Sequence, residues 1–336
     1  MNVVASDRHR TAWIELGPAD GPLMVFLHGW PERGLMWRAQ MTHFAAQGWR
    51  CVAPDMRGYG GSSAPASVSA YAQREIVADM VELHDALGGR PAVWVGHDWG
   101  SPVVFALAAQ HADRCRAVAS LCVPYLPEGF GLANLLPLVD RALYPASSFP
   151  DGQWGYYRYY SVDFDAAVAD FEASVPDVVK LMFRPGMAGM VGKPARSALV
   201  ALNSGWFGPE RRPPEIPGGA PLLSAEDFAD TVEGLSRNGF RGPCAWYLND
   251  EDNIAYAATA PDGGRLDLPV LFVHATWDVI CDTVHSALAD PMRAACTSLT
   301  EATIDAGHMV MLEQPGEVTE ALDTWLSRAV KSSSPS

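Results

Sequence analysis

Asp98 stands at the centre of residues 96–100, Gly-His-Asp-Trp-Gly, directly after a β-branched apolar run and directly before a helical pattern. A strand, a polar residue flanked by glycines and a helix together form the context of a nucleophile elbow. Glycine is needed on both sides because the turn strains its central residue, and side chains at positions 96 and 100 would collide across it. We therefore expect the Asp98 carboxylate at the carboxyl end of a sheet strand, where serine is the usual residue.

A carboxylate at this position narrows the chemistry. A serine that attacked an epoxide or an alkyl halide would form an ether, which water does not hydrolyse at a useful rate. A carboxylate that attacks the same sp³ carbon forms an alkyl ester, and water can then cleave that ester at its carbonyl carbon. The aspartate therefore favours attack on saturated carbon over ordinary ester or amide hydrolysis. Taken alone, the pattern also fits an aspartate that only caps the following helix.

Two further residues can complete a catalytic triad. Asp278 lies just past one expected strand, and His308 lies just past the next. A histidine can activate the water that cleaves the ester, and a carboxylate can orient that histidine and stabilise its charged form. The chain order of nucleophile, acid and histidine is that of the α/β-hydrolase fold and not of the other triad folds. Either residue alone would fit an ordinary loop, but all three at strand ends favour a triad.

The hydropathy pattern predicts the elements that would position these residues. Besides the elbow strand, strands are expected at residues 12–16, 22–27, 51–54, 117–123, 268–274 and 299–304, and helices at 36–46, 76–87, 101–112 and 318–330. Strands that alternate with helices imply a mostly parallel sheet with both faces covered.

The alternation stops after the strand expected at residues 117–123, where the pattern becomes helical and rich in aromatic residues. Its clearest helices are expected at residues 164–183 and 223–240. We therefore predict an α/β core in two parts, an inserted helical cap and a polar tail without packing capacity. The predicted ranges are 1–124 and 261–330 for the core, 125–260 for the cap and 331–336 for the tail.

Composition and charge restrict the partners. The 336 residues include 24 basic and 39 acidic side chains, for a net charge of −15, and such a surface repels phosphate backbones. No signal-peptide core and no run of 18 apolar residues is found, so we expect a soluble cytoplasmic protein without membrane contact. The six cysteines show no paired spacing and are expected as buried free thiols. No metal or cofactor is implied, and the sequence does not indicate an oligomeric state.

Four motifs together resemble the soluble epoxide hydrolases of the α/β-hydrolase superfamily. They are residues 28–32 (His-Gly-Trp-Pro-Glu), 55–60 (Asp-Met-Arg-Gly-Tyr-Gly), 96–100 and 305–308 (Asp-Ala-Gly-His). The resemblance covers nearly the whole chain, in the compact form without an added phosphatase-like domain or membrane anchor. It implies that Asp98 is the nucleophile, His308 the base and Asp278 the acid that orients the base.

The resemblance also implies the groups around the nucleophile. The backbone N–H groups of Trp30 and Trp99 are expected to form the oxyanion hole, because negative charge develops on the carbonyl oxygen of Asp98 when water attacks the ester. By the same resemblance, the Trp30–Pro31 bond is expected to be cis. Supporting positions are expected at His28, Gly29, Pro31 and His97.

Opening of an epoxide ring needs a proton donor for the departing oxygen, and a phenol is suited to this role at neutral pH. The resemblance implies two such tyrosines in the cap. Tyr247 matches the second of them. The first lies among the four tyrosines of residues 156–160, where the family's Tyr-x-x-Tyr register favours Tyr157 and leaves Tyr156 as the alternative. The expected substrate is a small epoxide, apolar or aromatic, and the expected product is a vicinal diol.

Two other readings remain. A haloalkane dehalogenase shares the aspartate nucleophile followed by tryptophan, but the asparagine of its His-Gly-Asn-Pro motif is replaced here by Trp30, and no carboxylate follows the strand expected at residues 117–123. A fluoroacetate-type dehalogenase would need arginines beside Asp98, and none is present there. A catalytically silent binding member of the fold would be indicated by the loss of a triad residue, and all three are present.

Overall fold

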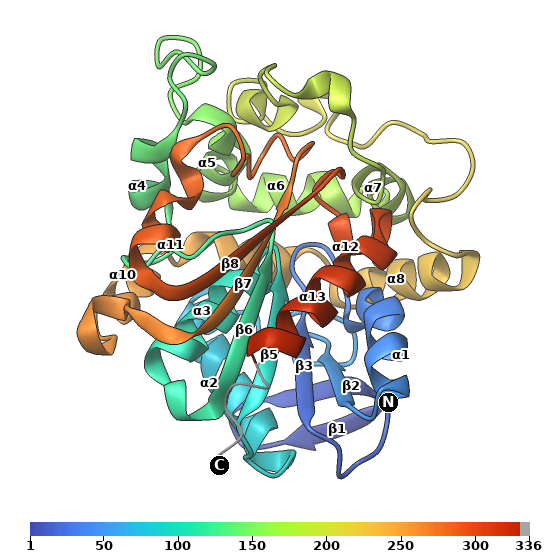
Figure 1. Cartoon of the computed structure of the whole chain (residues 1–336). Helices are drawn as coiled ribbons and strands as arrows, with labels where there is room; N and C mark the ends of the chain where they lie inside the picture. The colour runs from blue at the N-terminus through green and yellow to red at the C-terminus, as the bar shows by residue number, and fades with distance from the viewer. Residues whose placement is uncertain (330–336) are drawn as a thin grey trace.

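The computed structural model describes residues 1–329, whose strands form a single eight-stranded sheet in the order β1-β2-β4-β3-β5-β6-β7-β8 (Figure 1). The pairs β1/β2 and β2/β4 are antiparallel, and all other neighbours are parallel. The strands are β1 (Asn2–Ala5), β2 (Arg10–Leu16), β3 (Leu23–Leu27), β4 (Arg50–Pro54), β5 (Ala92–His97), β6 (Cys115–Leu121), β7 (Leu266–Ala275) and β8 (Cys296–Ile304). The predicted α/β-hydrolase architecture, a mostly parallel sheet flanked by helices, is confirmed.

The central strands are apolar because both faces of the sheet are covered. Every residue of β3 and of β5 is buried, as expected for parallel strands between two helical layers. On one side, α1 (Arg38–Ala46) packs against α13 (Pro315–Ala329) in front of the sheet in Figure 1. Behind the sheet, α2 (Gln73–Ala86) packs against α3 (Gly100–Gln110).

The register of the strands brings the expected site residues to one edge. Leu27 at the end of β3 pairs with Gly96 of β5, so the segment that starts at His28 lies beside the residue that follows β5, Asp98. At the other side of the site, Ala275 of β7 pairs with Ile304 of β8. The loops after these four strands therefore converge, as parallel strands require at a shared carboxyl edge.

The chain between β6 and β7 consists of helices joined by turns and long loops and lies across the top of the sheet in Figure 1. Its helices are α4 (Leu132–Leu135), α5 (Gly155–Val162), α6 (Phe164–Glu172), α7 (Val175–Met182), α8 (Ala225–Asn238), α9 (Arg241–Ala245) and α10 (Asp250–Ala257). We call this segment the cap. The limits 125 and 260 stay a prediction, because the helices locate the insertion without dividing the chain into domains.

The structure differs from the sequence expectations at two places, and a third expectation is not tested by it. Strand β1 was not predicted, because it is a short edge strand whose residues are mostly exposed and carry no buried pattern. The single helix expected over residues 164–183 is two helices, α6 and α7, and Pro176 lies in the first turn of α7, where its missing N–H is tolerated. The expected polar tail, residues 331–336, and the expected last helical residue, Val330, lie outside the described residues.

The state of the cysteines and the hydropathy of the helices can also be compared with the sequence analysis. All six cysteines are buried and unpaired, as predicted. Within residues 1–329, helices long and apolar enough to span a membrane are absent.

Candidate active site

The backbone around Asp98 has the strained conformation of a nucleophile elbow. Asp98 has φ +47°, in the left-handed region, and lies between the end of β5 and the start of α3. A Cβ atom added to Gly96 would lie 2.6 Å from the carbonyl oxygen of Gly100, and one added to Gly100 would lie 2.2 Å from that of Leu27. The two glycines are therefore required by backbone that cannot move aside.

Asp98, His308 and Asp278 lie in one hydrogen-bonded line. Nε2 of His308 is 3.3 Å from Oδ2 of Asp98, and Nδ1 of His308 is 2.6 Å from Oδ2 of Asp278. The second oxygen of Asp278 accepts the backbone N–H groups of Ile280 and Cys281, both at 3.0 Å, which fixes the carboxylate. The structure thus brings together the three residues expected from the strand ends.

The ionised forms of Asp98, His308 and Asp278 stabilise one another. Burial opposes ionisation of Asp98 and of Asp278, but His308 outweighs the burial and lowers the pKa of both carboxyl groups below the ordinary value. Burial likewise opposes the charged form of His308, yet Asp278 and Asp98 outweigh it and raise the pKa of His308 well above its ordinary value. Both neighbouring carboxylates therefore favour the charged form of His308.

Backbone N–H groups surround the other oxygen of Asp98. The N–H of Trp30 donates to Oδ1 of Asp98 over 2.6 Å. A Cβ at Gly29 would lie 2.3 Å from that oxygen and 2.6 Å from the backbone nitrogen of Trp99, so both lie beside the same small space. The two backbone nitrogens that we expect in an oxyanion hole are therefore close to Asp98.

Two features fix the conformation of the loop that carries Trp30. The Trp30–Pro31 peptide bond is cis, as the resemblance implied. Nε2 of His28 accepts the backbone N–H of Met56 over 2.9 Å, which ties this loop to the segment after β4. His28 thus supports the site through its side chain, and the backbone of Gly29 packs directly against the side chain of Asp98.

His97 has a partner that the sequence analysis did not assign. Its Nδ1 lies 2.7 Å from Oε1 of Glu32, and its Nε2 lies 2.7 Å from the backbone carbonyl of His308. The carbonyl group of His308 can only accept, so Nε2 of His97 donates to it, and Nδ1 is left to pair with the carboxyl group of Glu32. Both side chains are fully buried. The signal was Glu32 itself, directly after the His-Gly-Trp-Pro motif, but no sequence pattern links it to His97.

The candidate tyrosines of the cap have different surroundings: one hydroxyl group binds another cap residue, and the others lie near Asp98. Tyr157, which the register favoured, donates its hydroxyl to Oδ1 of Asp250 in the cap. The rings of Tyr156 and Tyr157 lie 5.7 and 5.0 Å from that of Tyr247. Burial raises the pKa of Tyr156 and of Tyr247 well above the ordinary value, and the charge of Asp98 adds to both shifts. Because Asp250 already binds the hydroxyl of Tyr157, and Asp98 acts on Tyr156 and Tyr247, we favour Tyr156 as the partner of Tyr247 near Asp98.

Aromatic rings enclose the space around these hydroxyl groups. Trp99 packs edge-on against Tyr247 with ring centres 5.0 Å apart, and Tyr160 lies 4.8 Å from Tyr247 on another side. Further rings in contact with this group are Trp30, Phe130, Phe171, Trp206, Phe240 and Trp246. Such walls suit an apolar or aromatic molecule.

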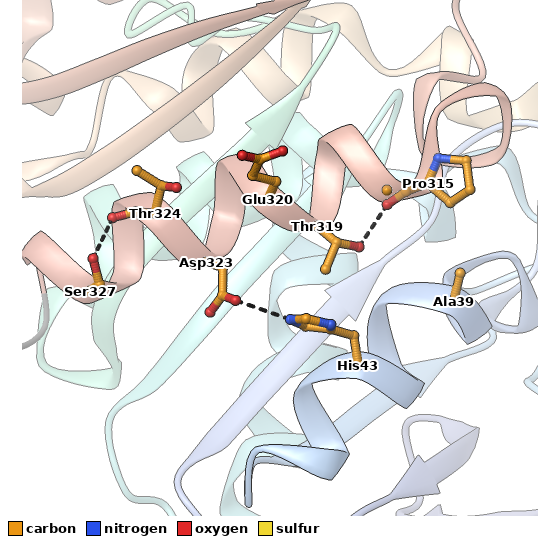
Figure 2. A pocket seen from close by; sticks show the side chains of 9 residues that line it. Ala39, His43, Pro315, Thr319, Glu320, Asp323, Thr324 and Ser327 are labelled. Carbon is orange, nitrogen blue, oxygen red and sulfur yellow. Dashed lines mark hydrogen bonds and ion pairs between the residues drawn. The ribbon is translucent and has the colours of Figure 1, made fainter.

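A surface hollow of about 710 Å³ lies elsewhere, between α1 and α13 (Figure 2). Most of its side chains are polar, and His43 reaches across it to Asp323 over 3.1 Å. None of the residues that line it belongs to the triad, to the loop of Trp30 or to the cap. We therefore place the chemistry at Asp98 and not in this hollow.

Together, the sheet order, the elbow and the triad define an α/β hydrolase, and residues 22–315 match the family model described as alpha/beta hydrolase fold. The chain is 35% identical over 324 residues to epoxide hydrolase A of Mycobacterium tuberculosis, covering 94% of this chain and 93% of that protein. It is 31% identical to the bifunctional epoxide hydrolase 2 of Sus scrofa, covering 94% of this chain and 53% of that longer protein.

Solved structures agree with these relatives. Epoxide hydrolase A from Mycobacterium thermoresistibile superposes with a TM-score of 0.78 at 28% identity, covering 97% of this chain and 98% of that one. An epoxide hydrolase from an endophytic Streptomyces has the same TM-score and identity, covering 97% and 94% of the two chains. The chain belongs to the epoxide hydrolase family of the α/β hydrolases.

Proposed function

We propose that this protein hydrolyses epoxides to vicinal diols through a covalent ester on Asp98. The observation that carries the proposal is the pair of cap phenols, Tyr156 and Tyr247, whose rings lie 5.7 Å apart near an aspartate that is hydrogen-bonded to His308. An epoxide bound between them would have its carbon beside the carboxylate and its oxygen beside two hydroxyl groups. The aromatic enclosure supports a small apolar or aromatic substrate.

In the first step, Oδ2 of Asp98 attacks one ring carbon, the carbon–oxygen bond of the epoxide breaks, and the departing oxygen takes a proton from the tyrosine pair. The assignment of Oδ2 follows from the hydrogen bond that Trp30 already makes to Oδ1. The raised pKa values of Tyr156 and Tyr247 mean that both phenols carry their protons in the resting enzyme. The product of this step is a hydroxyalkyl ester of Asp98.

In the second step, His308 removes a proton from water, and the hydroxide attacks the carbonyl carbon of the ester. Formation of the ester removes the negative charge of Asp98, one of the groups that raise the pKa of His308, so the histidine becomes a neutral base more readily. The charge that develops on Oδ1 is stabilised by the N–H groups of Trp30 and Trp99. When this intermediate collapses, the bond from the Asp98 carbonyl carbon to the diol oxygen breaks and that oxygen takes the proton from His308. The carboxyl group of Asp98 then loses its proton, which returns to the tyrosine pair, and the starting state is restored.

A haloalkane dehalogenase would use the same ester but would expel a halide, which needs N–H donors and no proton. The hydroxyl groups of Tyr156 and Tyr247 favour the epoxide, because they supply a proton that a halide does not use. One assay decides between the two reactions: the purified protein is incubated with styrene oxide and, in parallel, with 1-bromobutane. We expect diol from the epoxide and no bromide; bromide release without diol would reverse the assignment.

The ester itself is tested by one turnover in ¹⁸O water with enzyme in excess over styrene oxide. The water oxygen should enter the carboxyl group of Asp98, and the first diol released should carry unlabelled oxygen. Label in the diol after a single turnover, with none in the peptide that contains Asp98, would show direct attack by water.

A further inference from the structure

The cap is fastened to the core in different ways on its two sides. At α8, Arg33 binds Asp230 over 2.7 Å and Arg38 binds Asp227 over 3.1 Å, so ion pairs hold this side. On the other side, the segment that follows α7 meets the core close to the catalytic histidine. Here a single carboxylate, that of Glu313, makes the connection.

Glu313 is the last residue of α12 (Val310–Glu313), which lies below α7 in Figure 1. Its Oε2 accepts two backbone N–H groups at the same time, that of Gly186 in the cap and that of Gly307 in the core, both at 2.9 Å. Its Oε1 is buried and accepts no hydrogen bond from residues 1–329. A buried, half-satisfied carboxylate is costly, so two charge-assisted bonds must offset the cost at this point.

The two glycines meet backbone to backbone. A Cβ at Gly186 would lie 2.3 Å from Cα of Gly307 and 3.4 Å from Cβ of Trp277. Gly307 directly precedes His308, and Trp277 directly precedes Asp278. The cap segment at Gly186 therefore rests on both loops that carry the base and its orienting acid, and Glu313 bonds the cap and the histidine loop to the same oxygen.

We propose that Glu313 is a positioning residue that couples closure of the cap to the alignment of His308. With the cap closed, Oε2 holds Gly186 and Gly307 together and fixes the loop that ends in His308. If the cap moves away from the core, Gly186 leaves Glu313, and the loop that ends in His308 loses its contact with the cap. The inference rests on the proposed function, because it assigns Glu313 to the ester-hydrolysis step of that reaction.

This coupling has a kinetic signature that general loss of structure lacks. His308 acts in the second step, whereas ring opening needs Asp98 and the tyrosines. Misalignment of His308 should therefore slow ester hydrolysis and leave ester formation unchanged. Once hydrolysis limits turnover, kcat and KM fall together and kcat/KM stays constant. A partly unfolded enzyme would instead lose kcat at constant KM.

The test uses styrene oxide with rapid quenching and intact-protein mass, which gives the rates of ester formation and decay separately. We expect Glu313→Ala to slow ester decay about tenfold, and Glu313→Gln to slow it less because the amide oxygen still accepts N–H groups. Gly186→Ala should show the same slow decay from the cap side, since the added methyl presses on Gly307. Because only folded enzyme forms the ester, an unfolded fraction does not change the measured rate of ester decay.

Two matched variants serve as controls. Gly189→Ala changes the same cap segment where no heavy atom lies within 4 Å, and Glu317→Gln changes an exposed glutamate in the first turn of α13. Both should decay at the wild-type rate. Wild-type ester decay in Glu313→Ala or in Gly186→Ala would overturn the inference while the wild-type enzyme still makes diol. Absence of ester and diol in the wild type would overturn the proposed function itself.

Discussion

The backbone N–H of Trp30 donates to Oδ1 of Asp98 over 2.6 Å, although the two residues are 68 positions apart in the chain. The opposite oxygen, Oδ2, faces His308 at 3.3 Å. The two oxygens of Asp98 therefore differ in their surroundings. In the proposed reaction, Oδ1 is the oxygen on which negative charge would develop, and Oδ2 is the one that would bond to carbon.

Replacement of His308 by Gln should allow the ester to form and prevent its hydrolysis. A glutamine can fill the space but cannot accept a proton from water, and loss of a general base costs about 10²–10⁴-fold in rate. Intact-protein mass after mixing with styrene oxide should increase by the mass of one substrate molecule. Asp98→Ala is the control and should stay at its own mass. An unmodified His308→Gln protein, in conditions where the wild type turns over, would argue against a covalent ester.

Substitution of the cap tyrosines should affect the rate of ester formation at some positions and the stability of the protein at another. Tyr156→Phe with Tyr247→Phe should slow ester formation about 10²–10⁴-fold, because the departing oxygen then lacks its proton donor. Tyr157→Phe should keep the rate of ester formation but should lower stability by about 1–3 kcal/mol, because Asp250 loses the buried hydroxyl that it binds. Single-turnover kinetics and urea unfolding measure the two quantities. If Tyr157→Phe slowed ester formation as much as Tyr156→Phe does, Tyr157 would have to be assigned to the active site.

The two kinetic constants should depend on pH in different ranges. The pKa of Asp98 is lowered, so the nucleophile stays ionised and kcat/KM should persist into acid solution. Ester hydrolysis needs neutral His308, whose pKa in the resting enzyme is raised well above the ordinary value and falls only in part when the ester removes the charge of Asp98. With hydrolysis rate-limiting, kcat should fall on acidification at a higher pH than kcat/KM does. Coincident profiles from pH 5 to 9 would contradict this assignment.

The glycines of the elbow should resist even a methyl group. Gly100→Ala places a Cβ 2.2 Å from the carbonyl oxygen of Leu27, and Gly96→Ala places one 2.6 Å from that of Gly100. Because backbone atoms block both positions, each change should cost about 1–3 kcal/mol or more in the free energy of unfolding, measured in urea. Gly316→Ala is the control, since nothing lies within 4 Å of its added Cβ. Stability equal to the wild type in Gly100→Ala would mean that the elbow is less tight than described.

Much of this site could be predicted from local patterns. The elbow around Asp98 is contained in five consecutive residues, and its strand–turn–helix context follows from hydropathy. Asp278 and His308 could be placed because the ends of parallel strands share one edge of a sheet, whatever the details of packing. The family followed from motifs of the same local kind, and the comparisons confirmed it.

The rest depended on how distant segments pack. Tyr156 and Tyr157 are neighbours on α5, and successive residues of a helix point about 100° apart, so the rotation of that helix against the cap decides which hydroxyl binds Asp250. The break between α6 and α7 and the short edge strand β1 also depend on local detail that periodicity does not resolve.

The sequence by itself therefore determined the fold class, the chain order of the triad and the kind of bond that Asp98 can form, because these depend on residue types and on spacing along the chain. Only the tertiary structure decided that Glu32 faces His97, that Tyr157 binds Asp250 and that Glu313 binds both Gly186 and Gly307. Each of these is a contact between side chains or loops from separate elements. Such contacts are set by the rotation and depth of whole helices and strands, which no single stretch of sequence encodes.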